Sequence, residues 1–153
     1  MADTAPVVSA WFGLEFEGLV VGAFRECTGI GSESEVVEYR ESGTQGEFVV
    51  HKVPGRLKWN NITLKRGITD DIDVWKWRKL VEDGAVDQAR KNGAIVMFNE
   101  TGSEIARWHL FNAWPSKLVG PTTDATNNEV GIEEIELTVE GYYREGAPPT
   151  QRT

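Results

Sequence analysis

The sequence predicts a mainly β, antiparallel sandwich or barrel with one inserted α-helix. Most apolar residues stand in short runs that alternate with polar residues, which is the two-residue period of strands with one buried face. Turns rich in glycine and proline separate these runs, and one segment has the apolar spacing of a helix. At 153 residues the chain has the size of one domain. We expect a single domain over residues 1–153, with its core at about residues 11–144 and flexible ends at residues 1–8 and 146–153.

The first three strands follow from alternation and turn residues. Residues 11–17 place three apolar side chains on one side and two glutamates on the other. Gly18 then predicts a hairpin, with a return strand over residues 23–27 that ends near Gly29. Residues 35–40 are β-branched and aromatic enough to predict a third strand.

Residues 41–55 are predicted to form a long excursion with a little extended structure inside it. Glycines and a Pro-Gly step surround a short β-prone run. Loops of this length in compact domains usually serve a function or an interaction, although an ordinary mobile loop is the alternative. The residues assigned to this predicted arm are Gly43, Thr44, Gln45, Gly46, Glu47, Phe48, Val49, Val50, His51 and Lys52.

The middle of the chain predicts one more strand and the helix. Residues 57–66 alternate and stop at a glycine. Residues 69–71 supply capping side chains and negative charge ahead of a run whose apolar positions share one helical face, and Gly84 ends this run. Trp75 and Trp77 point to different sides of the helix, so one belongs to the core and the other to the core or to an interface.

The last third predicts a hairpin, a polar loop and a long strand. Residues 94–99 and 105–114 form the hairpin, which closes at Pro115, and residues 120–128 form the loop. The final strand spans residues 132–144, with Ile135, Leu137, Val139 and Tyr143 on one face. Its other face carries Glu134, Glu136 and Glu140. The pattern by itself is what a solvated outer face shows.

Composition excludes several classes of function. The net charge of −8 and the sequence pI near 4.8 argue against a general affinity for nucleic acid or anionic membrane, because both require a basic surface. The single Cys27 can form no internal disulfide, which suits a reducing cytoplasm. No leader pattern opens the sequence, and no apolar run approaches the roughly 20 residues that span a bilayer. We expect cytoplasmic assembly and no membrane insertion by the monomer.

No pattern indicates catalysis, a metal or a cofactor. Cys27 with His51 or His109 would be a possible dyad, but nothing local supports it, and an inert buried cysteine is the simpler interpretation. Zinc requires clustered Cys and His residues, and helix capping explains the acidic run at residues 70–73 without calcium. Residues 29–31 indicate a turn and not a phosphate-binding loop. We expect no cofactor and no enzyme activity.

Several segments occur in the order found in one protein family. They are residues 24–30, 35–43, 52–55, 62–67, Trp75 with Trp77, 111–117, 128–137 and 140–142. This order resembles the tail-tube protein family of contractile-tailed phages and the inner tube proteins of extracellular contractile injection systems, over about residues 11–144. Ser42-Gly43 departs from the paired glycines that are more usual in the family, which affects the local turn.

The resemblance implies a structural role. Six copies of a small β-barrel or sandwich would form a ring whose strands join into an inner barrel, and stacked rings would form a hollow tube. A contractile sheath would drive this tube through a target envelope, with cargo or DNA passing down the lumen. Implied partners are other copies of the chain, the sheath protein, and the baseplate or tube-initiator and terminator proteins. The arm at residues 43–52 would reach the next ring or subunit, and Glu134, Glu136 and Glu140 are candidates for an acidic lumen.

Two other functions remain as alternatives. One is a small-ligand-binding β-barrel, or a hydrolase of unrecognised type, with a tryptophan-rich pocket. The other is the tube protein of type VI secretion, which is also built from rings of subunits. Within the tube interpretation, the sequence leaves open a phage tail or an injection particle released from the cell, and the main tube subunit or a tube initiator.

Overall fold

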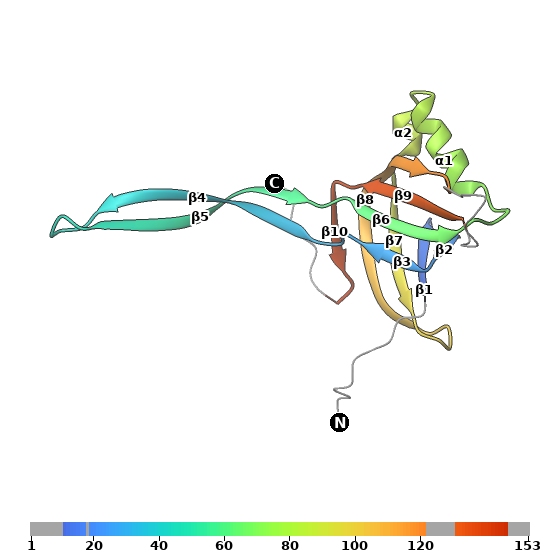
Figure 1. Ribbon diagram of the computed structural model, residues 1–153, viewed down its shortest axis with the longest axis horizontal. Helices are drawn as coiled ribbons and strands as arrows, with labels where there is room; N and C mark the ends of the chain where they lie inside the picture. The colour runs from blue at the N-terminus through green and yellow to red at the C-terminus, as the bar shows by residue number, and fades with distance from the viewer. Residues whose placement is uncertain (1–10, 18, 122–130, 147–153) are drawn as a thin grey trace, which may run out of the picture.

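The computed structural model describes residues 11–17, 19–121 and 131–146, and it confirms the mainly β, antiparallel prediction (Figure 1). In chain order the elements are β1 (Trp11–Phe16), β2 (Leu19–Phe24), β3 (Glu26–Thr28), β4 (Ser32–Ser42), β5 (Phe48–Trp59), β6 (Ile62–Gly67), α1 (Asp73–Glu82), α2 (Val86–Ala89), β7 (Lys91–Phe98), β8 (Glu104–Val119), β9 (Ile132–Thr138) and β10 (Gly141–Arg144).

Two sheets that share β8 form the body. The first half of β8 pairs with β7 and β10, and β7 continues through β1 to β2. The second half of β8 pairs with β9, which continues through β6 to β3. The prediction that this strand ends at Pro115 is wrong, since β8 runs on to Val119. Asn112 has a left-handed φ of 48° and the register shifts after Pro115, so a bend and a bulge carry the strand past a residue without a backbone donor.

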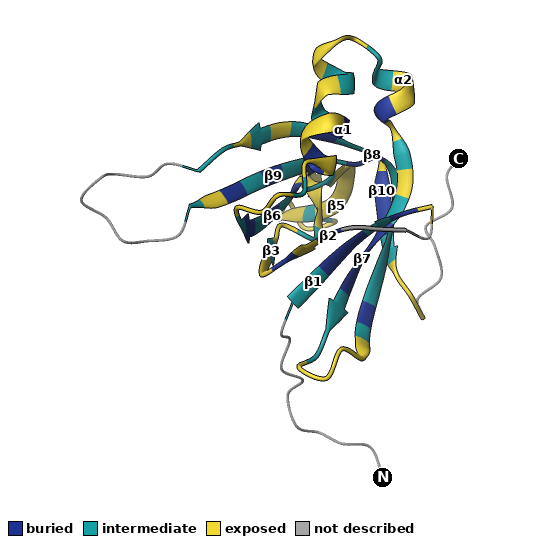
Figure 2. Ribbon diagram, turned by 90° about the vertical axis from the view of Figure 1, so that its right-hand side faces the viewer, coloured by how far each residue is buried: buried dark blue, intermediate teal, exposed yellow. Residues whose placement is uncertain are grey.

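Apolar side chains from both sheets meet in one core. The core side chains that are at most 1% exposed include Leu14, Ile62, Leu64, Val74, Ile95, Leu110, Ile135 and Leu137. Buried and less buried residues alternate along β6 and β9, as the two-residue period predicts. Figure 2 shows this alternation on β9. The body is therefore a sandwich filled by side chains.

The two helices lie together on one side of the body (Figures 1 and 2). The predicted helix is confirmed as α1, which starts two residues after Asp71 and ends before Gly84, whose φ is 84°. The side chain of Asp71 accepts a hydrogen bond from the Asp73 amide at 2.9 Å, so it satisfies one free N–H at the helix start. Trp77 is the core tryptophan: it is buried, donates to the Ala89 carbonyl at 2.6 Å and meets Phe16 edge-on.

Three predicted strands are each divided in the structure. The return strand expected at residues 23–27 breaks at Arg25 into the end of β2 and the start of β3. The strand expected at residues 57–66 breaks at residues 60–61 into the end of β5 and the whole of β6. The strand expected at residues 132–144 is interrupted at residues 139–140, after which β10 continues along β8 in the same direction as β9, since both pair antiparallel with β8. The interruption shifts the alternation of buried and exposed side chains by one residue, so Tyr142 is buried and not the predicted Tyr143. The predicted loop at residues 120–128 and the predicted flexible ends lie almost wholly outside the described residues.

Candidate assembly surface

The arm is a two-stranded antiparallel hairpin that extends from the body (Figure 1). Its pairing runs from Ser32 opposite Trp59 to Ser42 opposite Phe48. The predicted arm at residues 43–52 covers only its tip, and the excursion expected at residues 41–55 is largely paired strand. Both strands contain β-branched and aromatic side chains, more of them in residues 48–59 than in residues 32–42, and the two strands pair their backbone groups with each other.

A five-residue turn closes the hairpin. The Gly43 amide donates to the Glu47 carbonyl at 2.6 Å, and the Gly46 amide donates to the Gly43 carbonyl at 3.2 Å. Gly46 has a φ of 84°, a conformation that glycine adopts without steric cost. The Glu47 carboxylate also accepts the Gln45 amide at 3.1 Å. The tip therefore has a defined shape built from its own residues.

Both faces of the arm expose apolar side chains. The register places Val37, Tyr39, Val49 and Val53 on one face. It places Val36, Phe48, Val50 and Leu57 on the other. All eight are at least 39% exposed, and Phe48 is 72% exposed. An antiparallel ribbon that packs on one side normally has a polar second face, and large exposed apolar surfaces mark interaction sites. The subunit itself therefore covers neither face of the arm.

The two strands of the arm carry opposite charge. β4 contains four glutamates and one arginine, whereas β5 contains two lysines, one arginine and His51 without any acid. Two ion pairs cross the ladder, His51 with Glu41 at 3.1 Å and Lys52 with Glu38 at 3.9 Å, and Tyr39 stacks on His51. These exposed pairs contribute little to stability. They leave one acidic edge and one basic edge available to partners.

The root of the arm is fixed to the body by Tyr142. Its hydroxyl bonds to both the carbonyl and the amide of Gly31, and its ring meets Trp59 edge-on at 4.8 Å. The Asn60 amide donates to the Gly31 carbonyl at 3.0 Å, which joins the two arm strands at their base. Burial raises the pKa of Tyr142 against the opposing effect of its backbone hydrogen bonds, so the hydroxyl keeps its proton at neutral pH.

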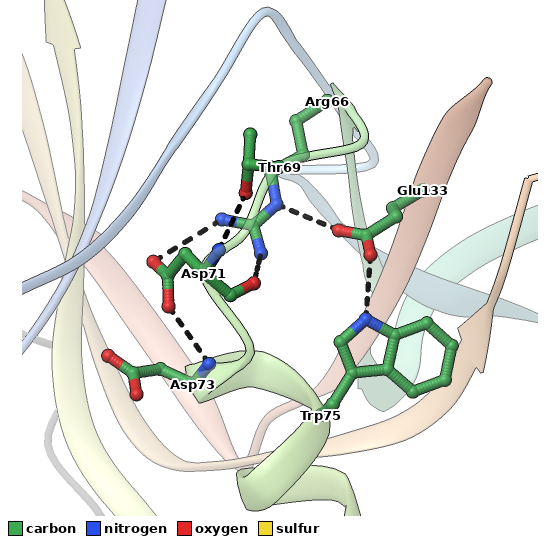
Figure 3. A network of polar contacts seen from close by, with 6 residues as sticks. All are labelled: Arg66, Thr69, Asp71, Asp73, Trp75 and Glu133. Atoms are coloured by element: carbon green, nitrogen blue, oxygen red, sulfur yellow. Dashed lines mark hydrogen bonds and ion pairs between the residues drawn. The ribbon is translucent and has the colours of Figure 1, made fainter.

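A buried polar network holds the start of α1 against β6 and β9 (Figure 3). Arg66 and Glu133 are each 4% exposed and pair at 3.0 Å. Arg66 also donates to the Asp71 carbonyl at 3.1 Å, and the indole of Trp75 donates to Glu133 at 2.7 Å. Every described buried side-chain polar atom has a partner. Glu133 was not singled out from the sequence, although its alternation with Ile135 places it on the buried face.

The structure separates the three predicted channel glutamates. Glu134 and Glu136 lie on the face of β9 away from the core, where the register sets them opposite Lys65 and Lys117 on the neighbouring strands. That face therefore has mixed charge and not a purely acidic one. Glu140 lies in the turn before β10, where its carboxylate accepts a hydrogen bond from Asn112 at 2.6 Å.

The residues considered for catalysis have other surroundings. Cys27 is half-buried in β3, and burial raises its pKa to about 12, which keeps the thiol protonated and unreactive. His51 pairs with Glu41 in the arm, while His109 stacks on Tyr143 and lies 3.9 Å from Glu145. Within the described residues no group of three or more His, Cys, Asp or Glu residues could hold a metal ion. Neither described helix has the length and apolar character to cross a membrane.

Comparison with known families decides the identity. Residues 8–143 match the family model described as T4-like virus tail tube protein gp19. The chain belongs to this family. It is therefore a tail tube protein, a structural tube subunit, and the resemblance inferred from its sequence is confirmed. A comparison with curated protein sequences gives no match.

Solved structures share the fold of this tail tube protein. The tube-terminating cap of the anti-feeding prophage is 25% identical with a TM-score of 0.74, covering 95% of this chain and 94% of that chain. The sheath-tube complex of PVC, an extracellular contractile injection system, contains a chain 24% identical with a TM-score of 0.75, covering 93% of each. Hcp1 from Flavobacterium johnsoniae is 12% identical with a TM-score of 0.54, covering 90% of this chain and 96% of that chain.

Proposed function

We propose that this tail tube protein forms six-membered rings that stack into the inner tube of a contractile phage tail or injection particle. The arm is the observation that supports this proposal most directly. Its 28 residues, from Ser32 to Trp59, expose apolar side chains on both faces and extend away from the body. Large exposed apolar surfaces mark interaction sites, and neighbouring copies of the chain can cover this one. The arm, including residues 43–52, therefore acts in contacts between subunits.

The proposal includes partners and a passage for cargo. The PVC relative comes from a sheath-tube complex and the anti-feeding prophage relative from a cap, which supports contacts with a sheath, a terminator and a baseplate. The face of β9 with Glu134 and Glu136 would line the lumen, and its alternation with Lys65 and Lys117 would leave no long stretch of one sign to trap cargo. Assembly would take place in the cytoplasm, and the protein would have no catalytic role.

Electron microscopy of the purified protein, with its mass in solution, tests this function. Rings or hollow tubes with six-fold end views are expected at high protein concentration. A monomer that forms neither, even with sheath and baseplate proteins present, would contradict the proposal and favour the ligand-binding alternative.

A shortened arm tests the role of the hairpin. Val37 and Val53 lie directly opposite each other, so an Asn-Gly turn can replace residues 38–52 without changing the register. This variant should keep the circular dichroism spectrum of a β protein but form no tubes. A matched control replaces residues 99–103 by Asn-Gly between Phe98 and Glu104, which also lie opposite each other. Normal tubes from the arm variant would show that assembly does not require the arm.

A further inference from the structure

A shallow hollow lies at the end of the body opposite the arm. It has a volume of about 310 Å³, and its lining includes Trp11, Phe24, Arg25, Arg66 and Ile68. The arm joins the body just before the first residue of β6, whereas the hollow lies at the last residues of the same strand. Figure 1 shows these two ends on opposite sides of the molecule. The hollow is near the lower limit of ligand sites, which suits one or two side chains.

The chemistry of the hollow matches the tip of the arm. Its wall is aromatic and aliphatic, with Trp11 stacked on Phe98 and Ile68 55% exposed. Arg25 is exposed at its edge and has no ion-pair partner among the described residues. At the tip, Phe48 is the most exposed large apolar side chain described, and the preceding Glu47 is an exposed acid.

The length of the arm also agrees with the size of the body that it would have to span. β5 has 12 residues, which at about 3.3 Å per residue gives an arm of about 40 Å. A compact body of about 100 residues has a radius of gyration near 13 Å, so the arm can pass along a neighbouring copy to its far end. A contact between opposite ends of identical chains is heterologous, and such contacts produce rings when the rotation closes and filaments when it does not.

We propose that Phe48 at the arm tip of one subunit inserts into the hollow formed by Trp11, Phe24 and Ile68 of a second copy, with Glu47 facing Arg25. This inference rests on the proposed self-assembly and names the contact that completes it. The buried pair of Arg66 with Glu133 stabilises the wall of the hollow, because Arg66 also lies 5.2 Å from the Phe24 ring. Arg25 remains available to an incoming carboxylate.

Exchanging the charges of Glu47 and Arg25 tests whether these two residues pair between subunits. Glu47→Arg and Arg25→Glu should each raise the protein concentration needed for tube formation about thirtyfold or more, the effect typical of a central interface contact. The double variant should restore assembly to near the wild-type concentration. Arg90→Glu reverses another exposed arginine and is the matched control, and circular dichroism confirms folding of each variant. Single variants that assemble like the wild type, or a double variant that does not recover, would overturn the pairing.

Photo-crosslinking gives a second measurement that does not depend on charge. Benzoylphenylalanine at position 48 in assembled tubes should crosslink to residues 11, 23–25 or 66–69 of another copy, as located by mass spectrometry. Crosslinks only to other parts of the chain, or only to a sheath or baseplate protein, would overturn the inference while the tube function stands. A wild-type chain that forms no rings or tubes would instead contradict the proposed function itself.

Discussion

The body and the arm of this tail tube protein are both antiparallel β structure, yet they distribute their apolar side chains in opposite ways. The body buries residues such as Leu14, Ile95 and Leu137 completely between two sheets. The arm leaves Val36, Phe48 and other apolar side chains exposed on both faces. A two-stranded hairpin alone is at best marginally stable in water, so the body and the arm depend on different contacts. Packing within the subunit stabilises the body, whereas the proposed function assigns the uncovered apolar side chains of the arm to packing between subunits.

Truncation of one buried and one arm side chain should show the largest difference between the two regions. Leu110→Ala removes a side chain that is 1% exposed and should lower the free energy of unfolding by about 3–5 kcal/mol. Val50→Ala, at a position 49% exposed, should change it by about 0.5 kcal/mol or less. Urea denaturation of the monomer followed by tryptophan fluorescence measures both. Equal losses would mean that the arm packs on its own body in solution.

The buried ion pair offers the next largest effect. Glu133→Ala leaves the buried Arg66 with Asp71 as its ion-pair partner and with the Phe24 ring, and should destabilise the body by about 3 kcal/mol. Glu134→Ala on the opposite face of β9 is the control and should cost little. Thermal unfolding monitored by circular dichroism distinguishes the two. A stable Glu133→Ala variant would show that Asp71 alone is enough to compensate the buried charge of Arg66.

The smallest effect is expected where the arm joins the body. Tyr142→Phe keeps the ring on Trp59 but removes the hydroxyl that bonds to Gly31, at a cost of about 1 kcal/mol. Amide hydrogen exchange should accelerate at Gly31 and Asn60 more than in the β7–β8 hairpin. Uniform acceleration across both regions would indicate global destabilisation and no specific role at the root.

The candidate site was only partly predictable. Glycine and proline around residues 43–52 predict an arm there, but nothing in the sequence of the flanking strands shows that they extend it to Ser32 and Trp59 and leave the body. The hollow combines Trp11, Phe24 and Ile68, which are distant in sequence. Likewise, the partner of Glu133 is 67 residues away, and no local pattern indicates such a pairing.

The sequence by itself determined the β class, the position of the helix and the buried faces of strands such as residues 11–16 and 62–67, because alternation and helical spacing are local properties of the chain. It also determined the family, through the order of its segments. The tertiary structure decided that β8 continues through Pro115 from one sheet to the other, and that the last strand is interrupted at residues 139–140 and continues as β10. It also decided which apolar strands remain uncovered. Burial depends on what packs against a strand, and that is fixed by elements far away along the chain.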